Sequence, residues 1–360
     1  MWFELIIGIV IFQLLRRFFS SGDDLDVGTY NDNALFSVAK RLEKIYGGKV
    51  YVGLRIPDID SGSPKNIDLV IVTHREAVII SVKNVSGFVS IDKDQNWVCM
   101  GVDKHKEECF PDPVAETKQL VPILESYLEQ RGLALPEGYL SCKVICSNPN
   151  FRTIHGDSFP PEVLTYDQWR QLKPEKDSVV SSFIKGAFKK EMKEPIQENL
   201  NSILSTAPMW DRLELKSNKR LLGDFVEFKG DKDDIFELRN IKRSKVSRVT
   251  IQKTSMFGLA TPICVKSTVA GAEELFWNPT HFEVSLVAVG GLRYLAVTCP
   301  AHSKLQVLYW PRDYQGEGAS GFEWNEVCVR SSTEVVFQPR GSTKVRKYKL
   351  SSVISMSLSA

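Results

Sequence analysis

The feature that most constrains this chain is a pair of apolar runs in its first third. Leu69–Val72 and Ala77–Val82 are separated by the polar segment Thr73–Glu76. Two such runs around a short polar segment predict a β-hairpin. The first residue of one hairpin strand lies opposite the last residue of the other. We therefore expect Asp68, just before the first run, and Lys83, just after the second, to lie close together at one end of the hairpin.

An acidic and a basic side chain at one hairpin end are suited to phosphodiester hydrolysis. A divalent cation such as Mg²⁺ needs hard oxygen ligands, and a nearby lysine can orient or deprotonate the attacking water. Asp68 would supply a metal-binding carboxylate and Lys83 the lysine. Ser81 lies two residues before Lys83 and so shares its face of the strand.

Ile67-Asp68, followed by Ser81–Asn84 and Gly87, resembles the motif of the nuclease-related domain (NERD) family of the PD-(D/E)xK nuclease-like superfamily. In that family an Ile-Asp pair is followed by a strand that ends in Glu-Val-Lys-Asn and then a glycine. The resemblance implies an α/β fold, a restriction-endonuclease-like mixed sheet flanked by helices. It also implies Mg²⁺ as the cofactor of an active member. Ser81 stands where the family has its second metal-binding carboxylate, and a neutral hydroxyl is a weak Mg²⁺ ligand.

Two other carboxylates have positions from which they can replace the missing ligand. Apolar spacing predicts a helix from Asn33 to Tyr46, and the resemblance places Asp32 where the family has a glutamate. An aspartate before a helix is also a common N-cap. The resemblance places Glu116, in the first turn of a second predicted helix, Pro113–Gln130, where many members have a glutamine. A glutamate there also complements the helix dipole. A carboxylate oxygen other than that of Asp68 within about 5 Å of the Lys83 ammonium would favour an active enzyme.

Composition sets the outer bounds. The chain has 360 residues, is 43% hydrophobic and 25% charged, and has a formal net charge of +2. It is long enough for two domains with their own cores, and the charge is too small to argue for a nucleic-acid partner. Its seven cysteines are odd in number and indicate reduced thiols in the cytosol. Cys99, His105 and Cys109 are compatible with a zinc site, but a surface loop is the favoured interpretation.

The N-terminal segment Trp2–Phe19 is mostly apolar. Its uninterrupted apolar part, Leu5–Phe12, is shorter than the roughly 20 residues of a spanning helix, so the aromatic ends would have to lie at the interfaces. Arg16-Arg17 on its C-terminal side predicts a single-pass membrane anchor with the bulk of the chain in the cytosol. An interfacial amphipathic helix or a buried helix is the alternative.

The rest of the chain divides by its periodicity. We expect an anchor at residues 1–19, a linker at 20–28, a NERD-like α/β domain at 29–188, a helical connector at 189–208 and a β-rich barrel or sandwich at 209–360. In the last part, Ile235–Leu238 alternates as a strand does, and Gly290-Gly291 predicts a tight hairpin. The basic stretch Arg239–Lys253 suits nucleic acid or anionic lipid, although basic residues on alternating strands are most commonly the solvated face.

Two functions follow from these residues. The first is a membrane-anchored protein whose nuclease-like site is degenerate because of Ser81, so that it binds or scaffolds rather than cleaves. The second is an active Mg²⁺-dependent nuclease in which Asp68 and Lys83 work with a substitute carboxylate from Glu116 or Asp32. Nucleic acid is the partner of the second function, and the sequence identifies no protein partner for either.

Overall fold

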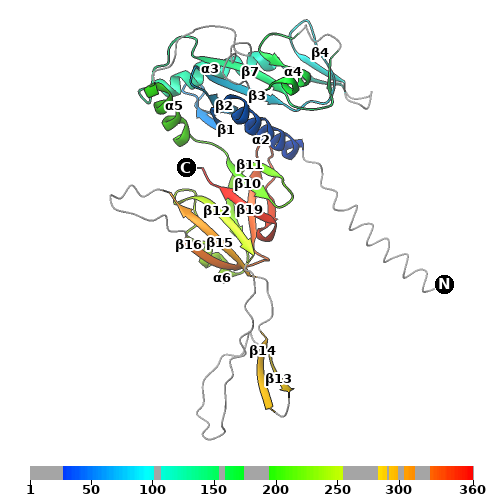
Figure 1. Cartoon of the computed structure of the whole chain (residues 1–360), viewed down its shortest axis with the longest axis vertical. Coiled ribbons are helices and arrows are strands. Elements are labelled where there is room, and N and C mark those ends of the chain that lie inside the picture. Colours follow the sequence, from blue (N-terminus) through cyan, green and yellow to red (C-terminus); the bar gives the residue numbers. More distant parts are fainter. Residues whose placement is uncertain are drawn as a thin grey trace, which may run out of the picture. The chain divides into compact units, whose positions relative to one another are not determined.

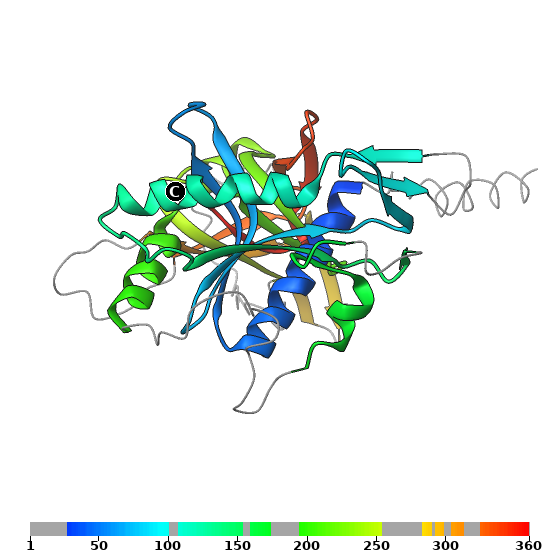
Figure 2. The same ribbon diagram turned by 90° about the horizontal axis from the view of Figure 1, so that it is seen from above.

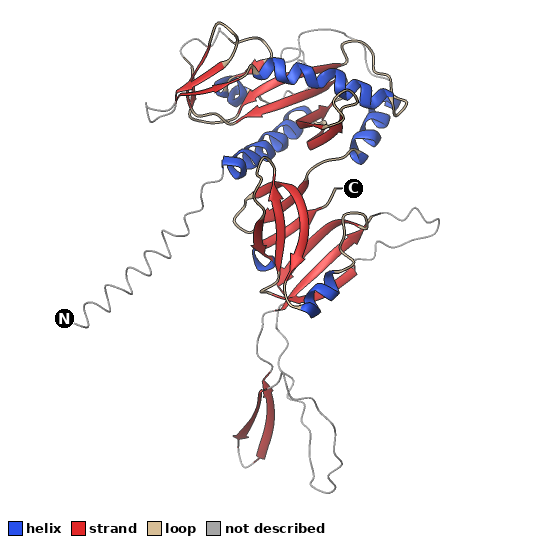
Figure 3. Cartoon of the chain, turned by 180° about the vertical axis from the view of Figure 1, so that it is seen from behind, coloured by secondary structure: helices blue, strands red, loops and turns tan. Residues whose placement is uncertain are grey.

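The computed structural model of the chain describes residues 27–100, 107–153, 159–173, 194–253, 283–289, 292–298, 304–312 and 325–359. Figures 1 and 3 show the elements in these ranges, from helix α2 to strand β19. The N-terminal half combines helices with mixed sheets, and the C-terminal half is rich in antiparallel strands. The expected α/β class with a β-rich C-terminal part is confirmed at this level.

A five-stranded mixed sheet organises the N-terminal half. Its order is β1-β2-β3-β7-β9, with β1, β2 and β3 antiparallel and β3, β7 and β9 parallel. The predicted hairpin is β2–β3 at its centre, with Leu69 opposite Ile80 and Val72 opposite Ala77. The strands are β1 Lys49–Pro57, β2 Pro64–Val72, β3 Ala77–Lys83, β7 Leu140–Cys146 and β9 Val163–Leu164.

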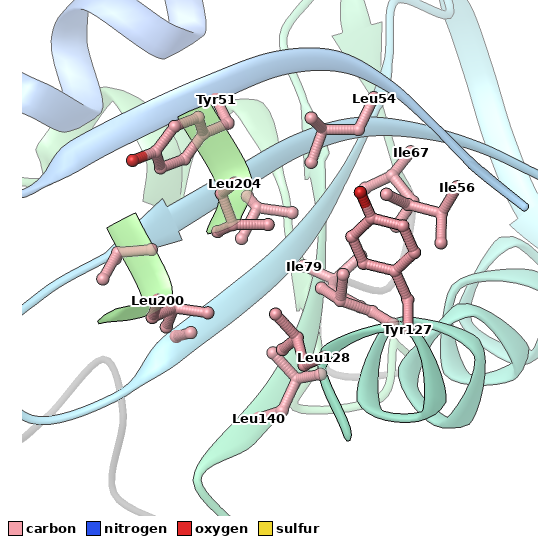
Figure 4. Close-up of a cluster of buried hydrophobic side chains, with 14 of the residues drawn as sticks. Tyr51, Leu54, Ile56, Ile67, Ile79, Tyr127, Leu128, Leu140, Leu200 and Leu204 are labelled. Carbon is pink, nitrogen blue, oxygen red and sulfur yellow. The ribbon is translucent and has the colours of Figure 1, made fainter. Parts of the chain in front are cut away.

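Helices cover both faces of this sheet, which explains why its central strands are apolar on both sides. Helices α3 and α5 bury Leu128 and Leu204 against one face (Figure 4). Helices α2 and α4 bury Leu35 and Trp169 against the other, and Figure 2 shows α2 and α3 on opposite sides of the strands. The helices are α2 Val27–Tyr46, α3 Pro113–Glu129, α4 Tyr166–Gln171 and α5 Glu194–Thr206.

A second, smaller sheet is formed by three strands from the connection between β3 and α3 and by one strand that follows β7. Its order is β6-β5-β4-β8, and Trp97 of β5 is buried with Val89 and Phe151 in a core that also contains Val144 and Cys146 of β7. The segment at residues 92–95 connects β4 and β5, which pair in antiparallel orientation. The strands are β4 Gly87–Ile91, β5 Trp97–Met100, β6 Glu107–Phe110 and β8 Phe151–Arg152.

The C-terminal half contains an eight-stranded sheet in the order β16-β15-β12-β19-β10-β11-β17-β18. A separate hairpin, β13 Glu283–Val289 and β14 Leu292–Thr298, pairs around the Gly-Gly position that predicted it. The sheet strands are β10 Asp211–Leu215, β11 Arg220–Lys229, β12 Val246–Lys253, β15 Lys304–Pro311, β16 Asn325–Arg330, β17 Glu334–Pro339, β18 Arg346–Lys349 and β19 Val353–Ser357. A short 3-10 turn, η2 Leu350–Ser352, precedes β19.

Three expectations about local structure are corrected. Ile235–Leu238 is not a strand but the second half of helix α6, Lys232–Leu238. Four residues are too few to separate the two periods, and acidic residues in the first turn favour the helix. Helix α2 begins at Val27 rather than Asn33, so the linker predicted at residues 20–28 overlaps its start and Asp32 is not its N-cap.

The described residues fall into two compact units. The first extends to Phe225 and also contains Phe337–Arg346, and the second contains Val226–Val336 and Lys347–Met356. The turn after β17 therefore belongs to the same unit as the five-stranded sheet, although residues 226–336, which lie between this sheet and the turn in sequence, belong to the second unit. The predicted division at residue 208 stays a prediction about independent folding.

The predicted membrane anchor, Trp2–Phe19, lies outside the described residues. Among the helices that the structure does describe, none combines the length and the apolar character needed to cross a membrane.

Candidate functional site

Asp68 lies on β2 where the regular alternation of the strand is interrupted. Ile67 and Val70 belong to the same apolar core, whereas strict alternation would put residues three apart on opposite faces. Gly53, across on β1, has a φ of +71°, a conformation that L-residues other than glycine rarely adopt. The carboxylate of Asp68 accepts a hydrogen bond at Oδ2 from the backbone N–H of Val82 (3.0 Å). The end of β3 thus fixes one of its two oxygens.

Asp32 lies in the second turn of α2, and only 3% of its surface is exposed. Its Oδ2 accepts a hydrogen bond from the backbone N–H of Leu222 on β11 (2.9 Å). The neighbouring Asn33 accepts at Oδ1 from the N–H of Arg220 on the same strand (2.8 Å). These two side chains bind the start of α2 to β11, so Asp32 supports the fold instead of capping its own helix.

Arg340 brings the two aspartates together. Its Nη1 donates to Oδ1 of Asp68 (2.8 Å) and its Nη2 donates to Oδ1 of Asp32 (3.3 Å). The arginine lies in the turn that follows β17, 272 residues beyond Asp68. We call Asp32, Asp68 and Arg340 the Asp–Arg–Asp triad. Within it, each of the four carboxylate oxygens accepts a hydrogen bond, two from the guanidinium and two from backbone N–H groups.

The surroundings of the triad shift the pKa values of two of its members. Burial raises the pKa of Asp32 from 3.8 to about 6, and the nearby charge of Asp68 adds to this, while Leu222 and Arg340 oppose it. Burial alone would lower the pKa of Arg340, but the two carboxylates outweigh it and the pKa is raised. The arginine therefore stays charged, and Asp32 is the member that takes up a proton under mildly acidic conditions.

Lys83 has a different partner. Its Nζ lies 3.3 Å from Oε2 of Glu116 in the first turn of α3, and the two side chains are 26% and 50% exposed. The 5 Å criterion for an active enzyme is therefore met by Glu116. Among the described residues, however, no ion pair joins Lys83 or Glu116 to a member of the triad. The hairpin end holds two separate ion pairs where the sequence suggested one site.

Ser81 continues the same hairpin. The β2–β3 pairing ends at Leu69 opposite Ile80, one residue before Ser81. On its other side Ser81 pairs with Val144 of the parallel strand β7. The parallel pairing therefore fixes the backbone at the position of the family's second carboxylate, and the side chain at that position is changed.

The arrangement does not fit a Mg²⁺ site. A magnesium ion needs carboxylate oxygens at about 2.0–2.1 Å in octahedral geometry. Both oxygens of Asp68 already accept hydrogen bonds, one of them from a guanidinium, and Ser81 offers no charge. Among the residues that the structure describes, no group of three or more His, Cys, Asp or Glu side chains is arranged to hold a metal ion. The zinc alternative remains untested, because His105 lies outside the described residues.

Sequence reasoning singled out every carboxylate of the site but missed Arg340. The only signal near it is the Pro339-Arg340-Gly341 sequence between two strand-like runs, which is typical of a turn. Gly341 has the positive φ, +75°, that such a turn uses. The turn was predictable, whereas its contact with Asp68 was not.

Comparison with known proteins gives one match. The family model of the nuclease-related domain, NERD, matches residues 31–146, a segment that includes Asp32, Asp68, Lys83 and Glu116. The resemblance of this segment to that family is thereby confirmed, and its mixed sheet is consistent with a nuclease-like fold. No curated protein and no solved structure matches the chain. The C-terminal half remains without a recognised family.

Proposed function

We propose that residues 31–146 form a restriction-endonuclease-like domain with a degenerate site that binds or scaffolds and does not cleave nucleic acid. The observation that carries this proposal is the state of Asp68. It is the one carboxylate that the hairpin motif retains, and its two oxygens accept hydrogen bonds from Arg340 and Val82. Asp32, the second carboxylate of the triad, likewise accepts hydrogen bonds at both oxygens, from Arg340 and Leu222, so the site offers a metal ion no free carboxylate.

A second candidate is supported by a different pair. The 3.3 Å contact between Lys83 and Glu116 places a carboxylate beside the lysine that activates water in active members of the family. An active Mg²⁺-dependent nuclease would need Glu116 and Asp68 to share one ion, and it would need Asp68 to leave Arg340. The contact itself is also what an exposed helix–strand ion pair provides, and such pairs contribute only about 0–1 kcal/mol.

A nuclease assay on the full-length chain separates the two candidates. Single-stranded DNA, double-stranded DNA and RNA are incubated with Mg²⁺ or Mn²⁺ and the wild type, Lys83→Ala or Ser81→Glu. We expect no cleavage by the wild type. Cleavage that is lost in Lys83→Ala and in chelator would establish the nuclease and overturn the proposal. A gain of cleavage in Ser81→Glu alone would show that the absent carboxylate is what silences the site.

The N-terminal segment supports a further part of the proposal, a membrane location. Its apolar run Leu5–Phe12 and the following Arg16-Arg17 favour an anchor with the domains in the cytosol. Alkaline carbonate extraction of cell membranes tests it. The anchor predicts that the chain stays in the pellet and that deletion of residues 1–19 releases it, whereas release of the intact chain would contradict it.

A further inference from the structure

We propose that the guanidinium of Arg340 is the resident cation of the nuclease-related domain, taking the place of a divalent metal ion between Asp32 and Asp68. The inference rests on the proposed function, because an active metal-dependent site would need the same carboxylates. It goes beyond that proposal by naming the group that neutralises the site and by predicting that its removal restores an affinity for metal.

Arg340 lies between the two aspartates. Arg340 gives one donor to each aspartate, at 2.8 Å to Asp68 and 3.3 Å to Asp32. A cation that bridges two carboxylates from different elements is the role of a metal ion in a hydrolytic site. A guanidinium can perform the same bridging because its N–H groups point in fixed directions. The bridge is thus preserved while the ion is replaced.

The guanidinium also balances the charge of the two aspartates. Two aspartates that lie this close together, one of them buried, need a positive charge between them, since burying unpaired carboxylates is costly. The arginine supplies one positive charge, and the N–H groups of Val82 and Leu222 supply two further hydrogen bonds. A divalent ion placed between the same oxygens would meet the guanidinium at close range, and like charges repel. The arginine and the metal therefore exclude each other.

Hydrogen bonds of the turn fix the backbone of Arg340. Its N–H donates to the carbonyl oxygen of Leu222 (2.7 Å), the residue whose N–H binds Asp32. The turn is closed by a bond from Ser342 N–H to Pro339 O (3.0 Å) and another from Gln338 Nε2 to Ser342 O (3.0 Å). These contacts fix the backbone of Arg340 next to the strand that binds Asp32, so the guanidinium starts from a defined position.

The close approach of the two strands supports the same conclusion. Gly223 lies beside the turn, and a Cβ atom there would overlap the carbonyl oxygen of Gln338. Only glycine lets β11 come this near to the residue that precedes the Pro339-Arg340 turn. The sequence thus contains a backbone feature, separate from the triad, that brings the arginine to the aspartates.

Mn²⁺ binding to the full-length chain tests the inference by electron paramagnetic resonance, which needs no catalytic activity. We expect the wild type to show no bound Mn²⁺ that depends on Asp68. We expect Arg340→Gln to bind Mn²⁺ at least about ten-fold more tightly than the wild type, and Arg340→Gln/Asp68→Asn to lose this gain. Arg55→Gln is the matched control, because Arg55 forms its ion pair in the same unit with Asp224 (3.0 Å), which is not a member of the triad.

The outcomes are decisive in both directions. Mn²⁺ bound by the wild type and lost in Asp68→Asn would overturn the inference, and so would a folded Arg340→Gln chain with no gain in Mn²⁺ affinity. A second measurement needs no arginine variant: Mn²⁺ should leave the melting temperature of the wild type unchanged, whereas a metal ligand at Asp68 would raise it. Nucleic-acid cleavage by a wild-type chain that still binds no Mn²⁺ at Asp68 would refute the proposed function and leave this inference standing.

Discussion

Removing the charge of Arg340 should destabilise the first unit, and the cost should depend on pH. In Arg340→Gln, the carboxylates of Asp32 and Asp68 face each other without the cation that separates them. Breaking one side of a buried ion pair costs about 3–5 kcal/mol. The side chains of Arg340 and Asp68 are 21% and 23% exposed, so solvent screening reduces this, and we expect about 2–4 kcal/mol at pH 7.5.

The pH dependence follows from Asp32. Its pKa is raised from 3.8 to about 6 in the folded wild type, which means that the native state holds the proton more tightly than the unfolded chain. Between these pKa values the native state binds more protons, so the free energy of unfolding falls as pH rises through that window. In Arg340→Gln the favourable charge of the arginine is gone, so the pKa of Asp32 moves above 6 and the window extends toward neutral pH.

At pH 5, Asp32 is therefore largely protonated in both proteins and the repulsion between the carboxylates is removed. Each pKa unit corresponds to about 1.4 kcal/mol, so an upward shift of about one unit or slightly more makes the Arg340→Gln cost about 1–2 kcal/mol larger at pH 7.5 than at pH 5. The sign of this difference is informative, because a purely structural role of the arginine stem would make the cost of Arg340→Gln equal at pH 5 and pH 7.5.

Hydrogen exchange followed by mass spectrometry provides the assay, because the chain has two units and one global unfolding curve would mix them. The amides of Val82 and Leu222 donate to Asp68 and Asp32, so peptides that contain them report on the triad. Arg55→Gln is again the control, with an expected cost of about 0–1 kcal/mol. A cost of Arg340→Gln that is equal at the two pH values, or larger at pH 5, would refute the reasoning.

Three further predictions follow from the same structure. Glu76 lies at the β2–β3 turn, where burial raises its pKa to about 7. Glu76→Gln should therefore gain stability relative to the wild type as pH rises from about 4.5 to 7, by at most about 3 kcal/mol. A difference in the free energy of unfolding between the two proteins that stays constant across that pH range would contradict this prediction. Gly223→Ala should destabilise by more than about 1 kcal/mol because its Cβ would overlap Gln338, whereas Gly62→Ala, whose Cβ would meet open space, should cost only what its positive φ imposes. Chelator should leave the melting temperature of the wild type unchanged, and a fall that added Mg²⁺ reverses would point to a bound metal.

Much of the fold was accessible from the sequence because the relevant signals are local. The β2–β3 hairpin follows from two apolar runs around a polar turn, and α3 follows from apolar periodicity after a helix-starting proline. The predicted start of α2, Asn33, lies six residues after the observed start, Val27, because the first turns of the helix contain few apolar residues. The strand predicted at Ile235–Leu238 is wrong for a related reason, because four residues are too few to distinguish the strand period from the helix period.

The Asp–Arg–Asp triad could not be predicted from the sequence, for a different reason. Asp68 and Arg340 are separated by 272 residues, and an arginine in a turn is ordinarily a solvated residue. The pattern around Gly341 predicts that the chain reverses there, but a turn sequence does not indicate which distant side chains the turn will contact. Asp32 illustrates the same limit from the other side, since its sequence position suits an N-cap and only the structure shows that it binds Leu222 and Arg340.

The aspartate and the lysine of the hairpin motif have different partners, Arg340 and Glu116. Two residues on facing strand ends share a site only if their side chains point to the same side of the sheet. Here Lys83 continues the face that α3 covers and pairs with Glu116, whereas the break in alternation after Ile67 lets Asp68 join Asp32 of α2. Each residue then has a structural partner of its own, so the aspartate and the lysine can both be retained for stability. The presence of Asp68 and Lys83 is therefore compatible with both proposed functions, and the measurement that separates them is metal binding at Asp68.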